Sequence, residues 1–192
     1  MLPMHTTFPF TNLNHTEMKK LFLLCALLLL IVSAFAQQTL YRYFNPKQGR
    51  HYYTTNFNEY GNGGQGWYLE GPQCIIFDHQ DRGLAPLFHY YNERVADHYY
   101  IISFNELGRG SKGYVLEGKI GFISPNPGPR LVPLFAYFNR VNGDHFLTTD
   151  RSELAQGFDG YEYTGTLGYV LPVGGNARPA RDRGRDFYRN HH

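Results

Sequence analysis

One spacing, 47 residues, relates identical amino acids across three successive stretches of this chain. Leu40, Leu87 and Leu134 follow this spacing. At average residue frequencies, chance would give about zero or one such set of three in a frame of this length. Six further sets keep the same step: Tyr43, Tyr90 and Tyr137; Asn45, Asn92 and Asn139; His51, His98 and His145; Glu59, Glu106 and Glu153; Gly66, Gly113 and Gly160; Gly71, Gly118 and Gly165. The sequence therefore uses one structural unit three times.

The first 36 residues have the layout of a secretory signal peptide. Lys19 and Lys20 precede an apolar run over residues 21–32, and Ala34-Phe35-Ala36 forms a small-x-small cleavage signal. A membrane anchor is the alternative, but the run is shorter than the span of about 20 residues that a bilayer requires. We therefore expect cleavage after Ala36 and a secreted or periplasmic mature chain with no membrane span.

The mature chain, residues 37–192, has a length that suits one domain with a sizeable core. Its one cysteine, Cys74, lies in an apolar run, so we expect a buried thiol and no internal disulfide. With Lys19, Lys20 and Glu17 removed, 16 Lys and Arg face 15 Asp and Glu, which is no nucleic-acid-binding footprint. Residues 172–192 hold five Arg and two Asp and indicate a disordered basic tail.

Each copy of the repeat indicates four β-strands. Aromatic residues favour strands over residues 40–44 and 51–55, and a turn cluster between them indicates a hairpin. A polar, glycine-rich loop follows. It has room for one helical turn at Glu59, Glu106 or Glu153, after Asn56, Ser103 or Asp150 as the cap. The remaining expected strands cover residues 66–70 and 74–77; 87–91, 98–102, 114–117 and 121–123; 134–138, 145–149, 161–164 and 168–171.

Three copies of a four-stranded unit can close around a pseudo-threefold axis. One copy cannot bury its own apolar surface, a solenoid needs end caps, and a propeller normally has at least four blades. We therefore predict an all-β fold, a β-trefoil over residues 37–171, with repeats 40–86, 87–133 and 134–171. In such a fold a six-stranded barrel is capped by three hairpins.

The polar residues found in every copy suit structural roles. Strand alternation sends Tyr43 and its equivalents to the core, where each hydroxyl needs a partner. Asn45, His51, Glu59 and their equivalents are the natural candidates. We interpret two of these sets as a structural hydrogen-bond clasp: Asn45, Asn92, Asn139, Glu59, Glu106 and Glu153. One repeat position holds a different residue type in each copy, namely Arg42, His89 and Ala136, which indicates an outward or pocket-facing side chain.

Metal and catalytic sites find little support. Three histidines bind zinc only if their nitrogens converge at about 2.0–2.1 Å from the ion, and we expect these histidines at the periphery. Neighbours such as Asp97 and His98 point to opposite faces of a strand, so they would not form a catalytic relay. We expect no metal, no cofactor and no catalysis.

The strings over residues 40–55, 87–100 and 134–149 resemble a secreted repeat family of unknown function. Its pattern is approximately L-Y-R-Y-Y-N…G-D-H-F-Y-T-T…E…G-W-x-Y-E-G, and the resemblance spans nearly all of residues 40–171. It implies a β-trefoil-like fold. Because these repeats often accompany hydrolase domains in extracellular bacterial and fungal proteins, it also implies an accessory binding role. The first copy departs at Arg50, where the pattern has Asp, and the second at Ile101-Ile102, where it has Thr-Thr.

Carbohydrate binding is the leading functional hypothesis, because sugars stack on aromatic rings and bind planar polar groups. Up to three weak, equivalent sites would gain strength from multivalency, with a glycan or cell-surface polysaccharide as partner and a monomeric chain. The alternative is a protein-binding scaffold (an adhesin or inhibitor) acting through the variable loops 56–65, 105–112 and 150–159. The candidate ligand-binding residues are Trp67, Tyr114, Tyr161, His51, Asp97, His98, Asp144, His145, Arg42 and His89, although Trp67 and its equivalents also suit a core role.

Overall fold

The computed structural model describes residues 14–20, 23, 37–154 and 160–174. The chain falls into two units, Met1–Ala36 and Gln37–His192. In the first unit, residues 15–20 are helical, and the Asn14 side chain accepts a hydrogen bond from the Glu17 amide at 3.0 Å. Most of the predicted signal peptide, including its cleavage site, and residues 175–192 of the predicted tail lie outside the described residues. No helix in the described ranges is long and apolar enough to cross a membrane.

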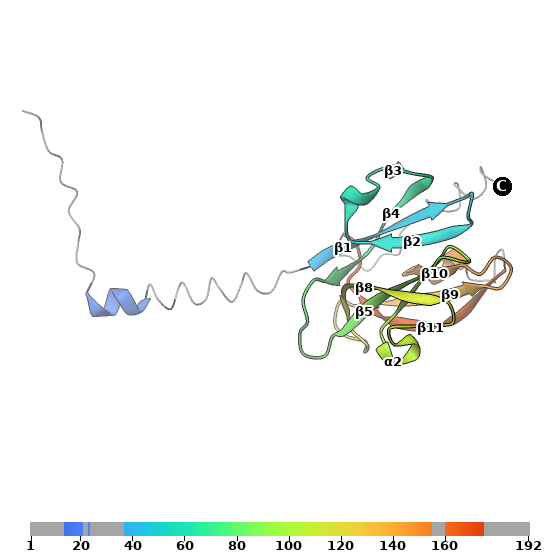
Figure 1. Cartoon of the computed structure of the whole chain (residues 1–192). Helices are drawn as coiled ribbons and strands as arrows, with labels where there is room; N and C mark the ends of the chain where they lie inside the picture. The colour runs from blue at the N-terminus through green and yellow to red at the C-terminus, as the bar shows by residue number, and fades with distance from the viewer. Residues whose placement is uncertain (1–13, 21–22, 24–36, 155–159, 175–192) are drawn as a thin grey trace, which may run out of the picture. The chain divides into compact units, whose positions relative to one another are not determined.

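The described part of the second unit is all-β and antiparallel, and its strands form three groups of the same design (Figure 1). In each group a hairpin is followed by a long strand that returns beside the first strand of the hairpin. We call the groups modules 1, 2 and 3. Their strands are β1 (Gln37–Asn45), β2 (Arg50–Thr54) and β4 (Trp67–Phe77); β5 (Ala85–Asn92), β6 (Asp97–Ile101) and β8 (Tyr114–Ile123); β9 (Val132–Asn139), β10 (His145–Thr148) and β11 (Tyr161–Val170).

The long strand of each module corrects the prediction of two separate strands there. β4, β8 and β11 each run through the glycine that was expected to end a strand, and the register shifts along each of them mark β-bulges. Gly71, Gly118 and Gly165 lie at these shifts with φ of 132°, 153° and 147°. Side chains other than hydrogen rarely tolerate this conformation, so the repeated glycine permits a bulge rather than ending the strand.

Short elements fill the loop between the hairpin and the long strand. The expected helical turn is confirmed in all three modules: η2 (Phe57–Glu59), α2 (Phe104–Leu107) and η3 (Arg151–Leu154). The Asp150 side chain accepts the Ser152 amide at 2.9 Å, whereas Asn56 and Ser103 form no side-chain cap bond. Two short strands were not predicted: β3 (Gly63–Gly64) pairs with the start of β4, and β7 (Gly110–Ser111) with the start of β8.

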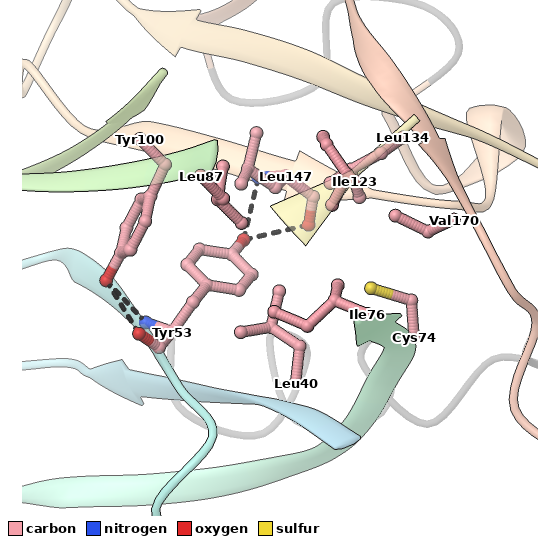
Figure 2. Packing of buried hydrophobic residues seen from close by; sticks show 10 residues of the cluster. All are labelled: Leu40, Tyr53, Cys74, Ile76, Leu87, Tyr100, Ile123, Leu134, Leu147 and Val170. Carbon is pink, nitrogen blue, oxygen red and sulfur yellow. Dashed lines mark hydrogen bonds between the residues drawn. The ribbon is translucent and has the colours of Figure 1, made fainter. Parts of the chain in front are cut away.

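The three modules share one hydrophobic core (Figure 2). Each contributes the same positions, which explains why Leu40, Leu87 and Leu134 are all 0% exposed. The long strands also meet one another, through the pairs Phe77–Phe122, Ile75–Leu171 and Ser124–Tyr169. Cys74 is part of this core, and burial raises the pKa of its thiol.

The tyrosines predicted to face inward do so, but their hydroxyl partners differ from the prediction. Tyr43 and Tyr90 are 0% exposed. Their hydroxyls donate to backbone carbonyls 18 residues further on, Gly61 at 2.9 Å and Gly108 at 2.7 Å. The repeated Asn, His and Glu side chains therefore serve other contacts.

Candidate functional site

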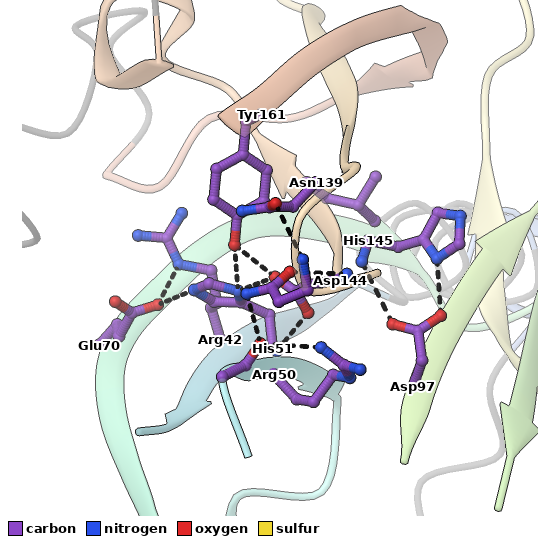
Figure 3. A network of polar contacts seen from close by, with 12 residues as sticks. Arg42, Arg50, His51, Glu70, Asp97, Asn139, Asp144, His145 and Tyr161 are labelled. Carbon is purple, nitrogen blue, oxygen red and sulfur yellow. Dashed lines mark hydrogen bonds and ion pairs between the residues drawn. The ribbon is translucent and has the colours of Figure 1, made fainter. Parts of the chain in front are cut away.

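The first polar network lies at the seam between modules 3 and 1 (Figure 3). Asp144, at the start of the second hairpin strand, is 0% exposed. Its Oδ1 accepts the His51 amide at 2.8 Å, its Oδ2 lies 2.6 Å from His51 Nδ1, and the Tyr161 hydroxyl donates to Oδ2 at 2.5 Å. One buried carboxylate therefore joins module 3 to His51 of module 1 through two hydrogen bonds and accepts a third from its own module.

The seam between modules 2 and 3 repeats this arrangement. Asp97 Oδ1 accepts the His145 amide at 3.2 Å, Oδ2 lies 2.7 Å from His145 Nδ1, and the Tyr114 hydroxyl donates to Oδ2 at 2.5 Å. Burial opposes ionisation of Asp97, but the contacts from His145 and Tyr114 prevail and lower its pKa. We call each set of Asp, His and Tyr a seam clasp.

The seam between modules 1 and 2 lacks the clasp, because two of its three residues differ. Arg50 stands where the other modules have Asp, and Trp67 stands 17 residues later where they have Tyr. Arg50 binds the Val95 carbonyl through Nε at 3.0 Å and Nη2 at 2.8 Å. The third member, His98, instead has its Nδ1 2.9 Å from His89 Nε2. The two changes belong together, because Arg50 offers no carboxylate to accept a hydrogen bond and Trp67 has no hydroxyl to donate one.

Burial keeps the two imidazoles of this seam neutral. Desolvation lowers the pKa of His89 to about 4. Desolvation, followed by the nearby His89, lowers the pKa of His98 to about 3. Tyr91 stacks on His98 with ring centroids 4.7 Å apart, so the seam is an aromatic cluster rather than an ionic one.

These contacts correct most of the predicted ligand-binding set. His51, Asp97 and Asp144 are 0% exposed and occupied in seam clasps, so a ligand cannot reach them, and the expectation of peripheral histidines is wrong for His51. Four further candidates are buried: Tyr161, Trp67, Arg42 and His89. Tyr114 is half-buried. The remaining two candidates, His98 and His145, are half-buried, and His145 lines a pocket described below.

The repeated asparagines organise the hairpin turns. Asn45 Oδ1 accepts the Gln48 amide at 3.2 Å, and Asn139 Oδ1 accepts the Val141 amide at 2.9 Å. A Cβ added at Gly113 would lie 2.8 Å from Asn92 Nδ2, which explains why glycine recurs at this position. The predicted structural role of these asparagines therefore has hydrogen bonds to support it.

The repeated glutamates bind different partners in different modules. Glu59 accepts the Tyr52 hydroxyl at 3.0 Å, and Glu106 accepts the Tyr99 hydroxyl at 2.6 Å. Glu153 instead accepts the Thr148 hydroxyl at 2.6 Å and pairs with an arginine of module 1.

That arginine, Arg42, fills a socket at the seam between modules 3 and 1. It donates to Glu153 from Nη1 at 3.1 Å and Nη2 at 2.6 Å, and to Glu70 from Nε at 2.6 Å. Its guanidinium carbon lies 4.6 Å from the Phe146 ring centroid. Burial opposes the charge of Arg42, but Glu70 and Glu153 outweigh it and raise the pKa of Arg42 well above its usual value.

A pocket of about 330 Å³ occupies the equivalent place between modules 2 and 3. Ala136 stands where Arg42 would be, and Thr164 where Glu70 would be, so the large side chains that close the socket are missing. Glu106, the counterpart of Glu153, remains at its wall. Tyr99, Tyr100, Ser103, His145, Leu147 and Thr166 also line the pocket.

Two residues that line the pocket, Tyr100 and Leu147, end a series of tyrosine hydrogen bonds that joins the modules. The Tyr100 hydroxyl binds the backbone of Tyr53 at 2.8 and 2.9 Å, and the Tyr53 hydroxyl binds that of Leu147 at 2.7 and 2.8 Å (Figure 2). Leu147, at the same position of module 3, has no hydroxyl with which to reach Tyr100. The pocket therefore opens where module 3 carries smaller or apolar residues at three positions.

Sequence reasoning did not name Ala136 or Thr164 as site residues, although it expected an outward or pocket-facing side chain at the position shared by Arg42, His89 and Ala136. The large polar residues Arg42 and His89 were predicted to contact a ligand, but each occupies the seam in which it lies. The position of the pocket was indicated instead by Ala136, the small residue at a position where the other two copies have Arg42 and His89.

The described ranges contain no group of three or more His, Cys, Asp or Glu residues that could hold a metal ion. No curated protein and no solved structure matches the chain. One family does match, over residues 37–171, which is most of the sequence and includes all three modules. The chain thus belongs to the family described as Domain of unknown function (DUF5648).

Proposed function

We propose that this chain is a secreted or periplasmic, non-catalytic binding module that holds a carbohydrate in the pocket between modules 2 and 3. The observation that carries the proposal is the composition of this pocket. A carboxylate from Glu106, an imidazole from His145 and hydroxyls from Ser103 and Thr164 line the pocket together with the apolar side chain of Leu147. Its volume of 330 Å³ lies at the lower end of the usual range for ligand sites, about 300–1,000 Å³.

This mixture of groups suits sugars. A sugar ring presents hydroxyls at its edge and C–H groups on its faces, so it requires polar partners beside apolar or aromatic surface. Tyr99 and Tyr137 supply aromatic rings to the wall. Asp97 engages His145 Nδ1 and fixes the orientation of the ring, which leaves Nε2 for a ligand.

The proposal of a non-catalytic role rests on how the Asp–His pairs are used. The pair Asp97–His145 beside the pocket has a counterpart, Asp144–His51, that is sealed in the interior. The same Asp–His pair therefore occurs once beside a pocket and once in the interior. This supports a role in joining modules rather than in proton transfer. No described hydroxyl or thiol hydrogen-bonds to His145, so the residues that the structure describes give His145 no nucleophile of the kind that acyl transfer needs.

We propose one site where the sequence suggested up to three. Arg42 fills the equivalent space between modules 3 and 1, and His89 with His98 fills that between modules 1 and 2. A closed, β-trefoil-like arrangement of the modules is part of the proposal. It is supported by the strand register that the modules share and by the contacts among β4, β8 and β11.

A glycan array with the wild type and the Ala136→Arg variant tests the proposal. The new arginine would stand opposite Glu106 as Arg42 stands opposite Glu153, so it would fill the pocket while satisfying its own charge. We expect the wild type to bind a set of glycans and the variant to lose them while keeping its thermal unfolding midpoint. Silence of the wild type on all glycans would contradict the proposal and favour a protein-binding scaffold acting through the variable loops.

A further inference from the structure

Taking the proposed function as given, we propose that the glycan bound in this pocket is an amino sugar with a free, positively charged amine, and that Glu106 binds the amine. The inference comes from comparing the two seams that place a carboxylate and an aromatic ring at the same positions.

The seam between modules 3 and 1 shows how this position binds a cation. Glu153 takes two hydrogen bonds from the Arg42 guanidinium, and the Phe146 ring lies beneath the guanidinium at 4.6 Å. A carboxylate beside an aromatic face is a favourable environment for a cation, because both attract positive charge.

The seam between modules 2 and 3 keeps a carboxylate and an aromatic residue at these positions and lacks the cation; here the His145 ring also packs against Tyr99, with ring centroids 4.0 Å apart. Glu106 corresponds to Glu153, and Tyr99 corresponds to Phe146, 47 residues before it in each case. The Tyr99 hydroxyl holds Glu106 beside the ring at 2.6 Å. Ala136 corresponds to Arg42, so the built-in cation has been removed.

The charge of the pocket is unbalanced as a result. No Lys or Arg is among the residues that line it, and within the described ranges Glu106 forms no ion pair. Its carboxylate is exposed, so a ligand can reach it. A ligand that brings a positive charge would therefore restore the balance that Arg42 provides at the other seam.

The remaining difference between the seams favours an ammonium over an arginine side chain. Arg42 binds two carboxylates: Glu70 receives its Nε, and Glu153 receives the other two nitrogens. At the pocket, Thr164 replaces Glu70 and supplies a hydroxyl in place of the second carboxylate. One carboxylate among several hydroxyls matches an amine carried on a ring of hydroxyl groups.

The test is a calorimetric titration with the β-1,4-linked trisaccharide of glucosamine and with its fully N-acetylated counterpart. At about pH 6 an amine with a pKa near that of an α-amino group, about 7.7–8.0, is charged. We expect the free-amine sugar to bind at least about tenfold more tightly, since charge-assisted hydrogen bonds are roughly twice as strong as neutral ones. Glu106→Gln should abolish this preference.

Glu59→Gln is the matched control. Glu59 accepts the Tyr52 hydroxyl as Glu106 accepts that of Tyr99, but it lies in module 1, away from the pocket. This variant should therefore keep the preference of the wild type.

Each outcome separates the inference from the proposed function. Equal binding of both sugars, lost in Ala136→Arg but unchanged in Glu106→Gln, would overturn the inference and leave carbohydrate binding intact. Absence of binding to both sugars would overturn the inference, and the glycan array then decides whether carbohydrate binding stands. Binding of an arginine-containing tripeptide, with every glycan on the array silent, would overturn both.

Discussion

The seam clasp between modules 3 and 1 gives the sharpest prediction about stability. Asp144→Ala removes an acceptor that is 0% exposed and leaves the His51 amide, the His51 ring and the Tyr161 hydroxyl without it. Removing one partner of a buried, hydrogen-bonded pair costs about 3–5 kcal/mol. For a chain of this size, about 2–4 °C of midpoint shift accompanies each kcal/mol. We therefore expect a fall of about 6–20 °C.

Thermal and urea unfolding, followed by circular dichroism, measure this effect. Glu162→Ala is the matched control, because it removes a carboxylate from module 3 whose pairing with Arg140 is exposed, and such pairs contribute little. Tyr161→Phe should cost about 1–2 kcal/mol in the wild type and less in Asp144→Ala, since its hydrogen bond to Asp144 Oδ2 is already gone. A loss below about 1 kcal/mol for Asp144→Ala, or strictly additive effects, would refute the clasp as a stabilising device.

Three further predictions follow from the seam without a clasp and from the core. The pKa values of His89 and His98 in the folded chain lie near 4 and 3, below the ordinary 6.5. The free energy of unfolding should therefore be highest above about pH 6.5 and fall as the pH drops toward 4, because the unfolded chain takes up protons first. Urea unfolding at a series of pH values should show this decrease, and His89→Gln should make it smaller. Arg50→Asp combined with Trp67→Tyr rebuilds the clasp, so NMR titration should find the pKa of His98 raised above 6, and an unchanged value would contradict the matched-substitution argument. Cys74, which is 0% exposed, should react with a thiol reagent only at the rate of unfolding, and fast labelling of the native chain would contradict its burial.

The sequence predicted the elements that depend on local patterns. The hairpin strands follow from alternating aromatic residues, and the inward position of Tyr43 follows from the pleat of a strand. Gly71 misled the prediction because a bulge and a strand end both use glycine, and only the pairing with β1 distinguishes them.

The seam clasps could not be predicted from spacing alone. Asp97 and Asp144 each bind the histidine of another module, so partners lie 48 and 93 positions apart, while the adjacent histidine points away. A signal was nevertheless present, because Arg50 and Trp67 depart together from the residues of the other two copies. Matched departures within one repeat indicate contact between the two positions.

The most direct test of the account is a map of the amide shifts of the ¹⁵N-labelled mature chain as the glucosamine trisaccharide is added. The account predicts saturable shifts around Tyr99, Glu106, Ala136 and Thr164, with the surroundings of Arg42 unchanged. Shifts of similar size at all three seams, or shifts only in the variable loops, would contradict a single open pocket between modules 2 and 3.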